Sequence, residues 1–353
     1  MKIVDVKWEK FKIELESPFK IALGTSYYHE GVLLKIITDE GIKGIGEAAP
    51  SERITGETTD TVCSVLNLFK NYLIGKNPFE IQKIMDDLNQ MLLHNTSAKC
   101  AVDIALWDIK AKYFGLPLRD LLGKDKEKIT TSITIGIKSI EETIKEAQEI
   151  IKRFGAKVLK IKVGLNLKED IEKIKELRDA IGYDVKIRVD ANQGYNLKEA
   201  VKFAKEVEKY EIELFEQPLP YYQLNELRIL RDKIGIPVML DESVHTARDA
   251  LKVIKENCCD VINIKLMKSG GICEALKIAS IAESAGIPCM VGCMVETRIG
   301  VSAGTHFALS VKNVKYADLD GHLFLKKDIA EGGVITKEGE NYITENKGLG
   351  VEF

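Results

Sequence analysis

The sequence lacks long apolar runs, paired cysteine motifs and any marked excess of charge of one sign. Its 353 residues carry 51 basic and 54 acidic side chains, a net charge of −3, which gives no broad attraction to nucleic acid or an anionic membrane. No apolar stretch approaches the ~20 residues of a transmembrane helix, and residues 1–13 show no signal-peptide core. The seven cysteines form no CxxC motif, so we expect reduced thiols in a cytoplasmic protein rather than disulfides or a zinc site.

The first 125 residues predict a small α+β unit. Val4–Leu15 and Gly31–Thr38 alternate as strands do, and a third short strand is expected at Lys43–Glu47. A helix is predicted from about Ser97 to Phe114, because apolar residues recur there near the helical period and Gly115 follows. Strands followed by helices are typical of an α+β arrangement.

Short β-branched runs recur from about residue 128 onward, separated by Lys/Glu-rich helical stretches. Markers near the strand ends, at positions 136, 162, 190, 216, 241, 265, 292 and 318, are 24 to 28 residues apart. So regular a period over eight units predicts a closed barrel. An open Rossmann-like sheet is less consistent with the sequence, since no GxGxxG motif follows a strand. The expected strands are Ile129–Ile137, Val158–Val163, Val185–Asp190, Ile212–Glu216, Val238–Asp241, Val261–Lys265, Pro288–Gly292 and Lys315–Asp318.

The predicted fold class is therefore α/β: a modified TIM barrel, (β/α)7β, over residues 126–320. No full amphipathic helix follows the last strand; a Gly-rich tail does. We expect the tail, residues 321–353, to return to the N-terminal unit and to form with residues 1–125 an α+β capping domain.

Acidic residues end three consecutive strands of the predicted barrel: Asp190, Glu216 and Asp241. Active sites of such barrels lie at the carboxyl ends of the strands. Three converging carboxylates would repel one another unless a cation neutralised them. Oxygen ligands without His or Cys favour a hard ion, so we expect one Mg²⁺ per subunit.

Lysines occupy two other strand ends. Lys160 and Lys162 are two residues apart, so they share one face of their strand, and Lys265 ends a strand four positions further round the ring of eight. Lysines are seldom buried without a partner or a task. A substrate carbon between the two strands would therefore meet an amine on each face.

Together these groups suit the removal of a proton next to a carboxylate. Such a proton is weakly acidic, and its loss builds an enediolate whose charge a divalent ion stabilises. A positioned base takes the proton. One base allows isomerisation or elimination, whereas two bases on opposite faces allow inversion. The pattern favours racemisation or epimerisation and leaves β-elimination open.

These residues resemble the enolase superfamily, and more narrowly its muconate lactonizing enzyme subgroup. The resemblance covers nearly the whole chain. Its motifs are Lys160-Ile161-Lys162, Asp190-Ala191-Asn192, Glu216-Gln217-Pro218, Asp241-Glu242-Ser243 and Asn263-Ile264-Lys265. Asp318-Leu319-Asp320 is similar to the Asp-x-Asp signature of the dipeptide epimerase family.

The Asp-x-Asp motif suits a dipeptide, because Asp318 and Asp320 share a strand face and could bind an α-ammonium group by charge-assisted hydrogen bonds. The resemblance implies that the α-carbon of the C-terminal residue is inverted. It also implies that Lys160 contacts the substrate carboxylate and that Lys162 and Lys265 are the acid/base pair.

Two further positions, Thr134 and Cys293, match positions of the family that line the substrate. Either could equally serve packing.

The resemblance implies that two loops of the capping domain recognise the substrate side chains, Ser17–Glu30 and Pro50–Glu57. Epimerases for Ala-Glu are similar in the first segment but place an arginine where this chain has Gly24, so a strict Ala-Glu preference is not expected. Leu23, Tyr27 and Tyr28 favour an apolar or broad preference, although the tyrosines could serve packing. Lys20 or Arg53 could still supply a cation.

Alternatives on the same scaffold are an N-succinylamino acid racemase or o-succinylbenzoate synthase, and a muconate-type cycloisomerase. A barrel used only for binding is the non-enzymatic alternative, which the complete set of strand-end residues disfavours. The expected partners are a dipeptide substrate and further copies of the chain in a homo-oligomer, with no nucleic acid and no membrane.

Overall fold

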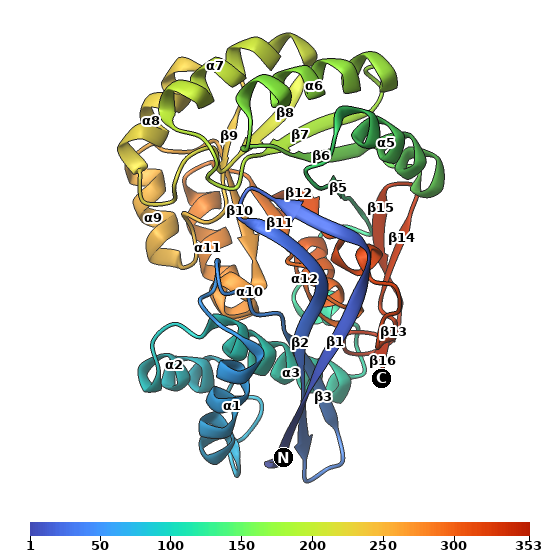
Figure 1. Cartoon of the computed structure of the whole chain (residues 1–353). Helices are drawn as coiled ribbons and strands as arrows, with labels where there is room; N and C mark the ends of the chain where they lie inside the picture. The colour runs from blue at the N-terminus through green and yellow to red at the C-terminus, as the bar shows by residue number, and fades with distance from the viewer.

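The computed structural model describes all 353 residues, 1–353. Figure 1 shows an N-terminal sheet and three helices below a barrel ringed by helices. The N-terminal sheet is antiparallel, in the order β1-β2-β3. Its elements are β1 (Ile3–Ile21), β2 (Gly24–Thr38), β3 (Lys43–Ala48), α1 (Thr59–Leu73), α2 (Ile81–Met91) and α3 (Thr96–Phe114).

The helix predicted from Ser97 to Phe114 is confirmed as α3, which ends at Gly115 in a left-handed conformation with φ of 69°. α3 packs so closely on β3 that a Cβ on Gly46 would lie 1.9 Å from the carbonyl oxygen of Ala101. Only glycine permits this approach of helix and sheet. The contact seals the apolar core of the capping domain.

The segment Ser17–Glu30, interpreted from the sequence as a loop that contacts the substrate, is instead largely β-strand, because β1 and β2 continue as one long hairpin. Ile21 pairs with Gly24, so Ala22 and Leu23 form the turn. Figure 1 shows this blue hairpin crossing in front of the barrel strands. Ala-Leu is not a typical two-residue turn sequence, which is why the pattern did not predict a hairpin here.

The eight-unit barrel is confirmed. Eight parallel strands follow one another in the order β5 to β12, and the amide of Ser132 donates to the carbonyl of Ala317 at 3.0 Å across the join between last and first strands. The strands are β5 (Ile133–Ile135), β6 (Val158–Lys162), β7 (Lys186–Asp190), β8 (Ile212–Glu216), β9 (Val238–Leu240), β10 (Val261–Lys265), β11 (Cys289–Gly292) and β12 (Val314–Asp318).

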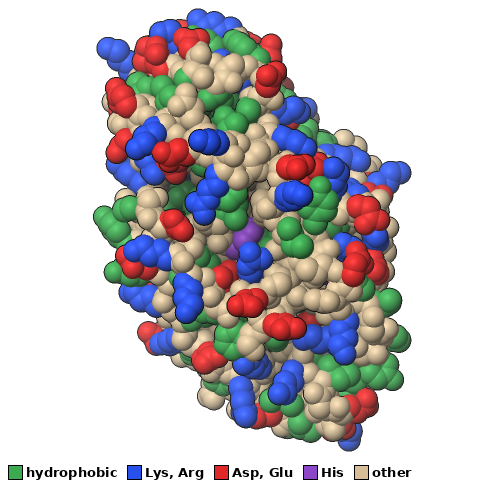
Figure 2. Space-filling model, turned by 90° about the vertical axis from the view of Figure 1, so that its right-hand side faces the viewer, with side chains coloured by type: hydrophobic (Ala, Val, Ile, Leu, Met, Phe, Trp, Pro, Cys, Tyr) green, Lys and Arg blue, Asp and Glu red, His purple; other side chains and the backbone are tan.

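Helices surround the barrel (Figure 1). They are α5 (Ile140–Phe154), α6 (Leu167–Ile181), α7 (Leu197–Val207), α8 (Leu224–Lys233), α9 (Ala247–Lys255), α10 (Leu266–Ser269), α11 (Ile272–Ser284) and α12 (Arg298–Ser310), with α4 (Leu118–Leu121) leading in and short 3₁₀ turns at Glu208–Tyr210 and Gly321–Phe324. No helix combines the length and hydrophobicity that a membrane span requires. Basic and acidic side chains are interspersed over the face in Figure 2.

The predicted strand Ile129–Ile137 is two strands, and only β5 belongs to the barrel. β4 (Ile129–Thr130) pairs instead with β15 (Glu340–Ile343) of the tail, next to β14 (Val334–Lys337). The remaining tail strands, β13 (Glu331–Gly332) and β16 (Val351–Glu352), pair with each other.

The tail contacts both parts of the molecule. Leu325 bridges to Leu15 of β1, whereas Val334 and Ile343 join the apolar core that surrounds the barrel strands. The assignment of residues 321–353 to the capping domain stays a prediction.

Candidate active site

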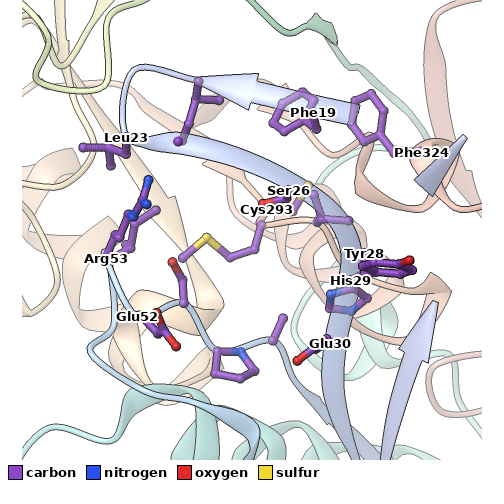
Figure 3. Close-up of a pocket in the computed structure, with 18 of the residues that line it drawn as sticks. Phe19, Leu23, Ser26, Tyr28, His29, Glu30, Glu52, Arg53, Cys293 and Phe324 are labelled. Atoms are coloured by element: carbon purple, nitrogen blue, oxygen red, sulfur yellow. The ribbon is translucent and has the colours of Figure 1, made fainter. Parts of the chain in front are cut away.

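A cavity of about 660 Å³ lies where the capping domain meets the carboxyl ends of the barrel strands. The hairpin tip and the segment after Pro50 line one side of it, and Figure 3 shows Leu23 and Arg53 of these segments close together, with Cys293 of the barrel further into the cavity. Among the residues with predicted roles, those that line the cavity are Gly24, Thr134, Lys160, Lys162, Lys265, Cys293, Asp318 and Asp320.

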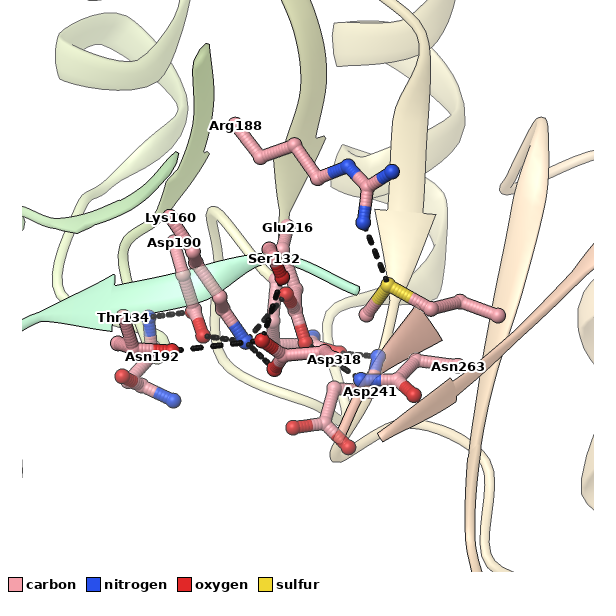
Figure 4. A network of polar contacts seen from close by, with 12 residues as sticks. Ser132, Thr134, Lys160, Arg188, Asp190, Asn192, Glu216, Asp241, Asn263 and Asp318 are labelled. Carbon is pink, nitrogen blue, oxygen red and sulfur yellow. Dashed lines mark hydrogen bonds and ion pairs between the residues drawn. The ribbon is translucent and has the colours of Figure 1, made fainter. Parts of the chain in front are cut away.

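The two lysines of β6, Lys160 and Lys162, both point into the barrel, while Leu159 and Ile161, which alternate with them, pack outward into the apolar core. Nζ of Lys160 lies 2.7 Å from Glu216 Oε2, 2.7 Å from Asp318 Oδ2 and 3.0 Å from Asp190 Oδ2. Figure 4 shows this ammonium group at the centre of the polar network. One side chain thus connects carboxylates of β7, β8 and β12.

Lys162 and Lys265 lie on β6 and β10, which are four places apart in the ring of eight strands. Nζ of Lys162 lies 2.7 Å from Asp190 Oδ2 and 2.9 Å from Asn192 Oδ1. Nζ of Lys265 lies 2.7 Å from Asp241 Oδ2. Both lysines line the same cavity, so two ammonium groups from opposite sides of the barrel reach one space.

The three strand-end carboxylates Asp190, Glu216 and Asp241 are fully buried. No three acidic, His or Cys side chains have the spacing of a metal site; lysine ammonium groups lie between these carboxylates instead. The donor chemistry nevertheless fits a hard cation, since every donor is a carboxylate oxygen. Oε2 of Glu216 and both carboxylate oxygens of Asp241 are in ion pairs with lysine ammonium groups at 2.5 to 2.7 Å, so their lone pairs would be available to an ion if these ammonium groups withdrew.

The charges of this network control one another. Burial opposes the charged form of Lys160, but Asp190 and the other carboxylates raise its pKa well above the ordinary value. Burial also opposes the charge of Lys265, and Asp241 nevertheless raises the pKa of that lysine. Burial and the nearby Asp190 raise the pKa of Glu216 to about 7. The lysines are therefore the counter-charges of the carboxylates, a role that a divalent cation would take over.

The Asp-x-Asp pair lies beside the lysines and is held by Ser132 and by Thr134 of β5. Oδ1 of Asp318 accepts a hydrogen bond from the Ser132 hydroxyl at 2.6 Å, and Oδ2 of Asp320 accepts one from the Thr134 amide at 2.7 Å. Burial opposes ionisation of Asp318, but Lys160 lowers its pKa to about 2. Burial and the charge of Asp318 raise the pKa of Asp320 to about 7. The pKa values of the two neighbouring carboxyl groups are therefore well separated.

Cys293 lies next to this pair. Its thiol donates to the Asp318 carbonyl with Sγ and O 3.3 Å apart, and burial raises its pKa well above the ordinary value. A neutral thiol at the cavity wall provides shape rather than a nucleophile.

Several residues that hold the site in place were not assigned roles from the sequence. Asn263 donates to Glu216 Oε1 at 2.7 Å. Gln217 accepts from the amides of Asp241 and Ser243 at 3.0 and 3.1 Å. Asn192 and Gln217 adopt positive φ angles of 40° and 32°, a backbone strain that is common at functional sites. The signal in the sequence that could have identified these residues is that each of them lies within one of the strand-end motifs.

Lys268 is another residue of the site for which the sequence predicted no role. It is fully buried, lies 2.5 Å from Asp241 Oδ1, and donates to the carbonyl oxygens of Asp241, Val244 and Asn263. It sits three residues beyond Lys265 on the short helix α10, where a charge would ordinarily be assigned to the surface.

Comparisons with known proteins identify the family of this chain. Residues 142–353 match the family described as enolase C-terminal domain-like, and residues 3–123 match the mandelate racemase / muconate lactonizing enzyme N-terminal domain. An L-Ala-D/L-Glu epimerase of Clostridium acetobutylicum is 41% identical over 100% of this chain and 99% of its own. A hydrophobic dipeptide epimerase of Enterococcus faecalis is 43% identical over 95% and 94%.

Solved structures show the same likeness. The dipeptide epimerase of Enterococcus faecalis V583, complexed with Mg and the dipeptide L-Leu-L-Tyr, superposes with a TM-score of 0.98 at 41% identity over 100% of both chains. An N-succinyl Arg/Lys racemase of Bacillus cereus superposes with a TM-score of 0.97 at 35% identity over 100% of this chain and 96% of its own.

The fold and these matches define an enzyme of the enolase superfamily, in its muconate lactonizing branch. Within it, the chain belongs to the dipeptide epimerase family, which makes it an isomerase. The substrates named for its relatives differ, from Ala-Glu to hydrophobic dipeptides.

Proposed function

We propose that this protein inverts the α-carbon of the C-terminal residue of an L,L-dipeptide by 1,1-proton transfer between Lys162 and Lys265. The observation that carries the proposal is the arrival of these two side chains, from strands on opposite sides of the barrel, in one cavity that also contains Asp318 and Asp320. Two lysines on opposite faces of one carbon allow inversion, because one can remove the proton and the other can return it.

The dipeptide is bound at both ends. Lys160 interacts with the substrate carboxylate, and Asp318 with Asp320 receives the α-ammonium group through charge-assisted hydrogen bonds. Thr134 supports this end, because its amide holds Asp320 and its hydroxyl lies 3.3 Å from Asp318 Oδ1. The reacting carbon is then fixed between the two lysines, which lowers the entropic cost of reaction.

Asp190, Glu216 and Asp241 would hold one Mg²⁺ per subunit. The bound ion would stabilise the negative charge that develops on the substrate carboxylate when the α-proton leaves. Asn263 and Lys268 keep Glu216 and Asp241 in position through the contacts described above.

The proton transfer needs the two lysines in opposite charge states. One lysine, as a neutral amine, takes the α-proton and becomes an ammonium group. The other, as an ammonium group, returns a proton to the opposite face and becomes neutral. The pair exchanges roles for the reverse direction, so the epimers interconvert without net consumption of protons.

We propose an apolar or broad side-chain preference rather than strict Ala-Glu selectivity. Leu23, Ile54 and Phe324 contribute apolar side chains to the cavity wall. Tyr27 and Tyr28 also line it and remain 58% and 48% exposed, so they are available to a substrate side chain rather than committed to the core. Gly24 contributes space but no charge.

The test is incubation of the protein and Mg²⁺ with a library of L,L-dipeptides in D₂O, followed by mass spectrometry and chiral separation. We expect the gain of one deuteron at the C-terminal residue together with the L,D epimer. N-succinylamino acids and muconate lactone substrates are run in parallel. Exchange of N-succinylamino acids without exchange of any dipeptide would refute the proposal and favour the racemase alternative.

A further inference from the structure

The side chain of Arg53 occupies the space above Gly24. A Cβ placed on Gly24 would lie 1.8 Å from Nη1 and 2.6 Å from Cζ of Arg53. Gly24 also has φ of 145°, a conformation that residues with side chains rarely adopt. The glycine therefore admits a guanidinium group from another segment, 29 residues further along the chain, at the tip of the hairpin.

Arg53 is an exposed residue that lines the cavity, and its side chain forms no ion pair or hydrogen bond. Two acidic residues of the rim are already paired, Glu30 with Lys12 and Asp60 with Lys10, whereas Glu52 forms no ion pair. Figure 3 shows Arg53 extending from its segment toward Leu23, with Glu52 lower on the same segment. The guanidinium group of Arg53 is therefore a rim cation with no partner in the protein, free to bind a ligand.

We propose that Arg53 is a specificity-determining residue that accepts the carboxylate of an acidic dipeptide side chain, so that Asp- or Glu-containing dipeptides belong to the substrates of this site. The proposal rests on the proposed dipeptide epimerase function. A guanidinium group presents paired N–H donors that match a carboxylate, and it repels a cationic side chain. Gly24 is its positioning partner, because any side chain at position 24 displaces the guanidinium group.

The apolar wall and the single cation act on different substrates. Leu23 and the tyrosines contact uncharged side chains, whose turnover should not depend on Arg53. A carboxylate side chain would lose a charge-assisted contact if Arg53 were replaced, which corresponds to about a 10- to 100-fold loss in kcat/KM. The loss should appear mainly in KM, since the contact is present before and during proton transfer.

The experiment compares L-Ala-L-Glu, its neutral isostere L-Ala-L-Gln, L-Ala-L-Lys and L-Ala-L-Leu with the wild-type enzyme and the variant Arg53→Met. We expect the variant to lose about 10- to 100-fold with L-Ala-L-Glu and less than threefold with the Gln and Leu dipeptides. Arg153→Met is the matched control, because Arg153 is exposed at the end of α5 and its loss changes net charge equally.

Gly24→Ala provides an independent route to the same result. Its Cβ would displace the guanidinium group, so the ratio of L-Ala-L-Glu to L-Ala-L-Gln turnover should fall even though Arg53 is intact. Equal losses for the Glu and Gln dipeptides in Arg53→Met, or a wild-type preference for L-Ala-L-Lys, would overturn the inference. Epimerisation of none of the four dipeptides, with activity on N-succinylamino acids, would instead refute the proposed function itself.

Discussion

Glu47 of the capping domain accepts two hydrogen bonds from Thr297 at the start of α12, from its amide at 3.0 Å and from its hydroxyl at 2.5 Å. The amide of Gly300 donates to the same carboxylate at 2.8 Å, and His29 Nε2 lies 3.0 Å from Oε1. Glu47 is fully buried. One carboxylate therefore caps a helix of the barrel and fixes a residue of the hairpin that lines the cavity.

Replacement of Glu47 should weaken the connection between the two domains. Glu47→Leu leaves the donors of Thr297 and Gly300 without an acceptor, so we expect a loss of about 3 kcal/mol or more in the free energy of unfolding, measured by urea denaturation. Glu14→Ala is the control, since the exposed pair of Glu14 with Lys326 should contribute at most about 1 kcal/mol. Equal effects of the two variants would contradict this role.

Glu296 should make stability depend on pH. Burial and the neighbouring Glu47 raise the pKa of Glu296 to about 8. Between its ordinary pKa and about 8 the folded protein keeps a proton that the unfolded chain releases, so the free energy of unfolding falls as pH rises through this window. Glu296→Gln cannot ionise and can still accept from the Met294 amide.

We therefore expect Glu296→Gln to gain stability relative to wild type as pH rises, by a few kcal/mol between about pH 5 and about pH 9. Urea denaturation at several pH values measures the difference. A constant difference across the range would show that Glu296 is ionised in the folded protein.

Variants of the two proposed bases, Lys162 and Lys265, should differ in which epimer exchanges its α-proton. Lys162→Ala and Lys265→Ala each remove one base, and each should reduce epimerisation by about 10²–10⁴-fold or more. In D₂O, each variant should still exchange the α-proton of only one epimer, L,L or L,D, because a single base faces a single side of the carbon. Exchange of both epimers by one variant would argue against a two-base reaction.

Removal of divalent ions should abolish activity and added Mg²⁺ should restore it. Asp241→Asn should weaken Mg²⁺ binding, measured by isothermal titration calorimetry, because it removes one of three anionic donors. Asp86→Asn, on the exposed face of α2, is the control for the change in net charge. Unchanged Mg²⁺ affinity in Asp241→Asn would refute the proposed ligand set.

The barrel and the strand-end residues were predictable because both follow from spacing along the chain. A regular repeat of buried strands fixes which residues reach the carboxyl ends, and the two-residue alternation fixes which of them point inward. Lys160 and Lys162 could be placed on one face for this reason, and β10 could be placed across from β6 by counting strands.

Contacts between segments that lack a common period could not be predicted. From the sequence, Lys268 is expected to be an exposed residue of a short helix. Only the fold shows that its ammonium group donates to three carbonyl groups. Arg53 lies above Gly24 because a hairpin with an atypical turn meets a segment of irregular structure. Neither the turn nor the approach has a signature in the local sequence.

The contacts of Lys160 have a consequence for biosynthesis. Its partner Asp318 belongs to the last barrel strand, whereas Lys160 belongs to the second. A chain still emerging from the ribosome, or one cut before β12, would contain both proposed bases and all three proposed metal ligands but would lack this ion pair. Activity should therefore appear only once synthesis has passed Asp318. A fragment that ends before β12 should be inactive, although it contains the other strand ends.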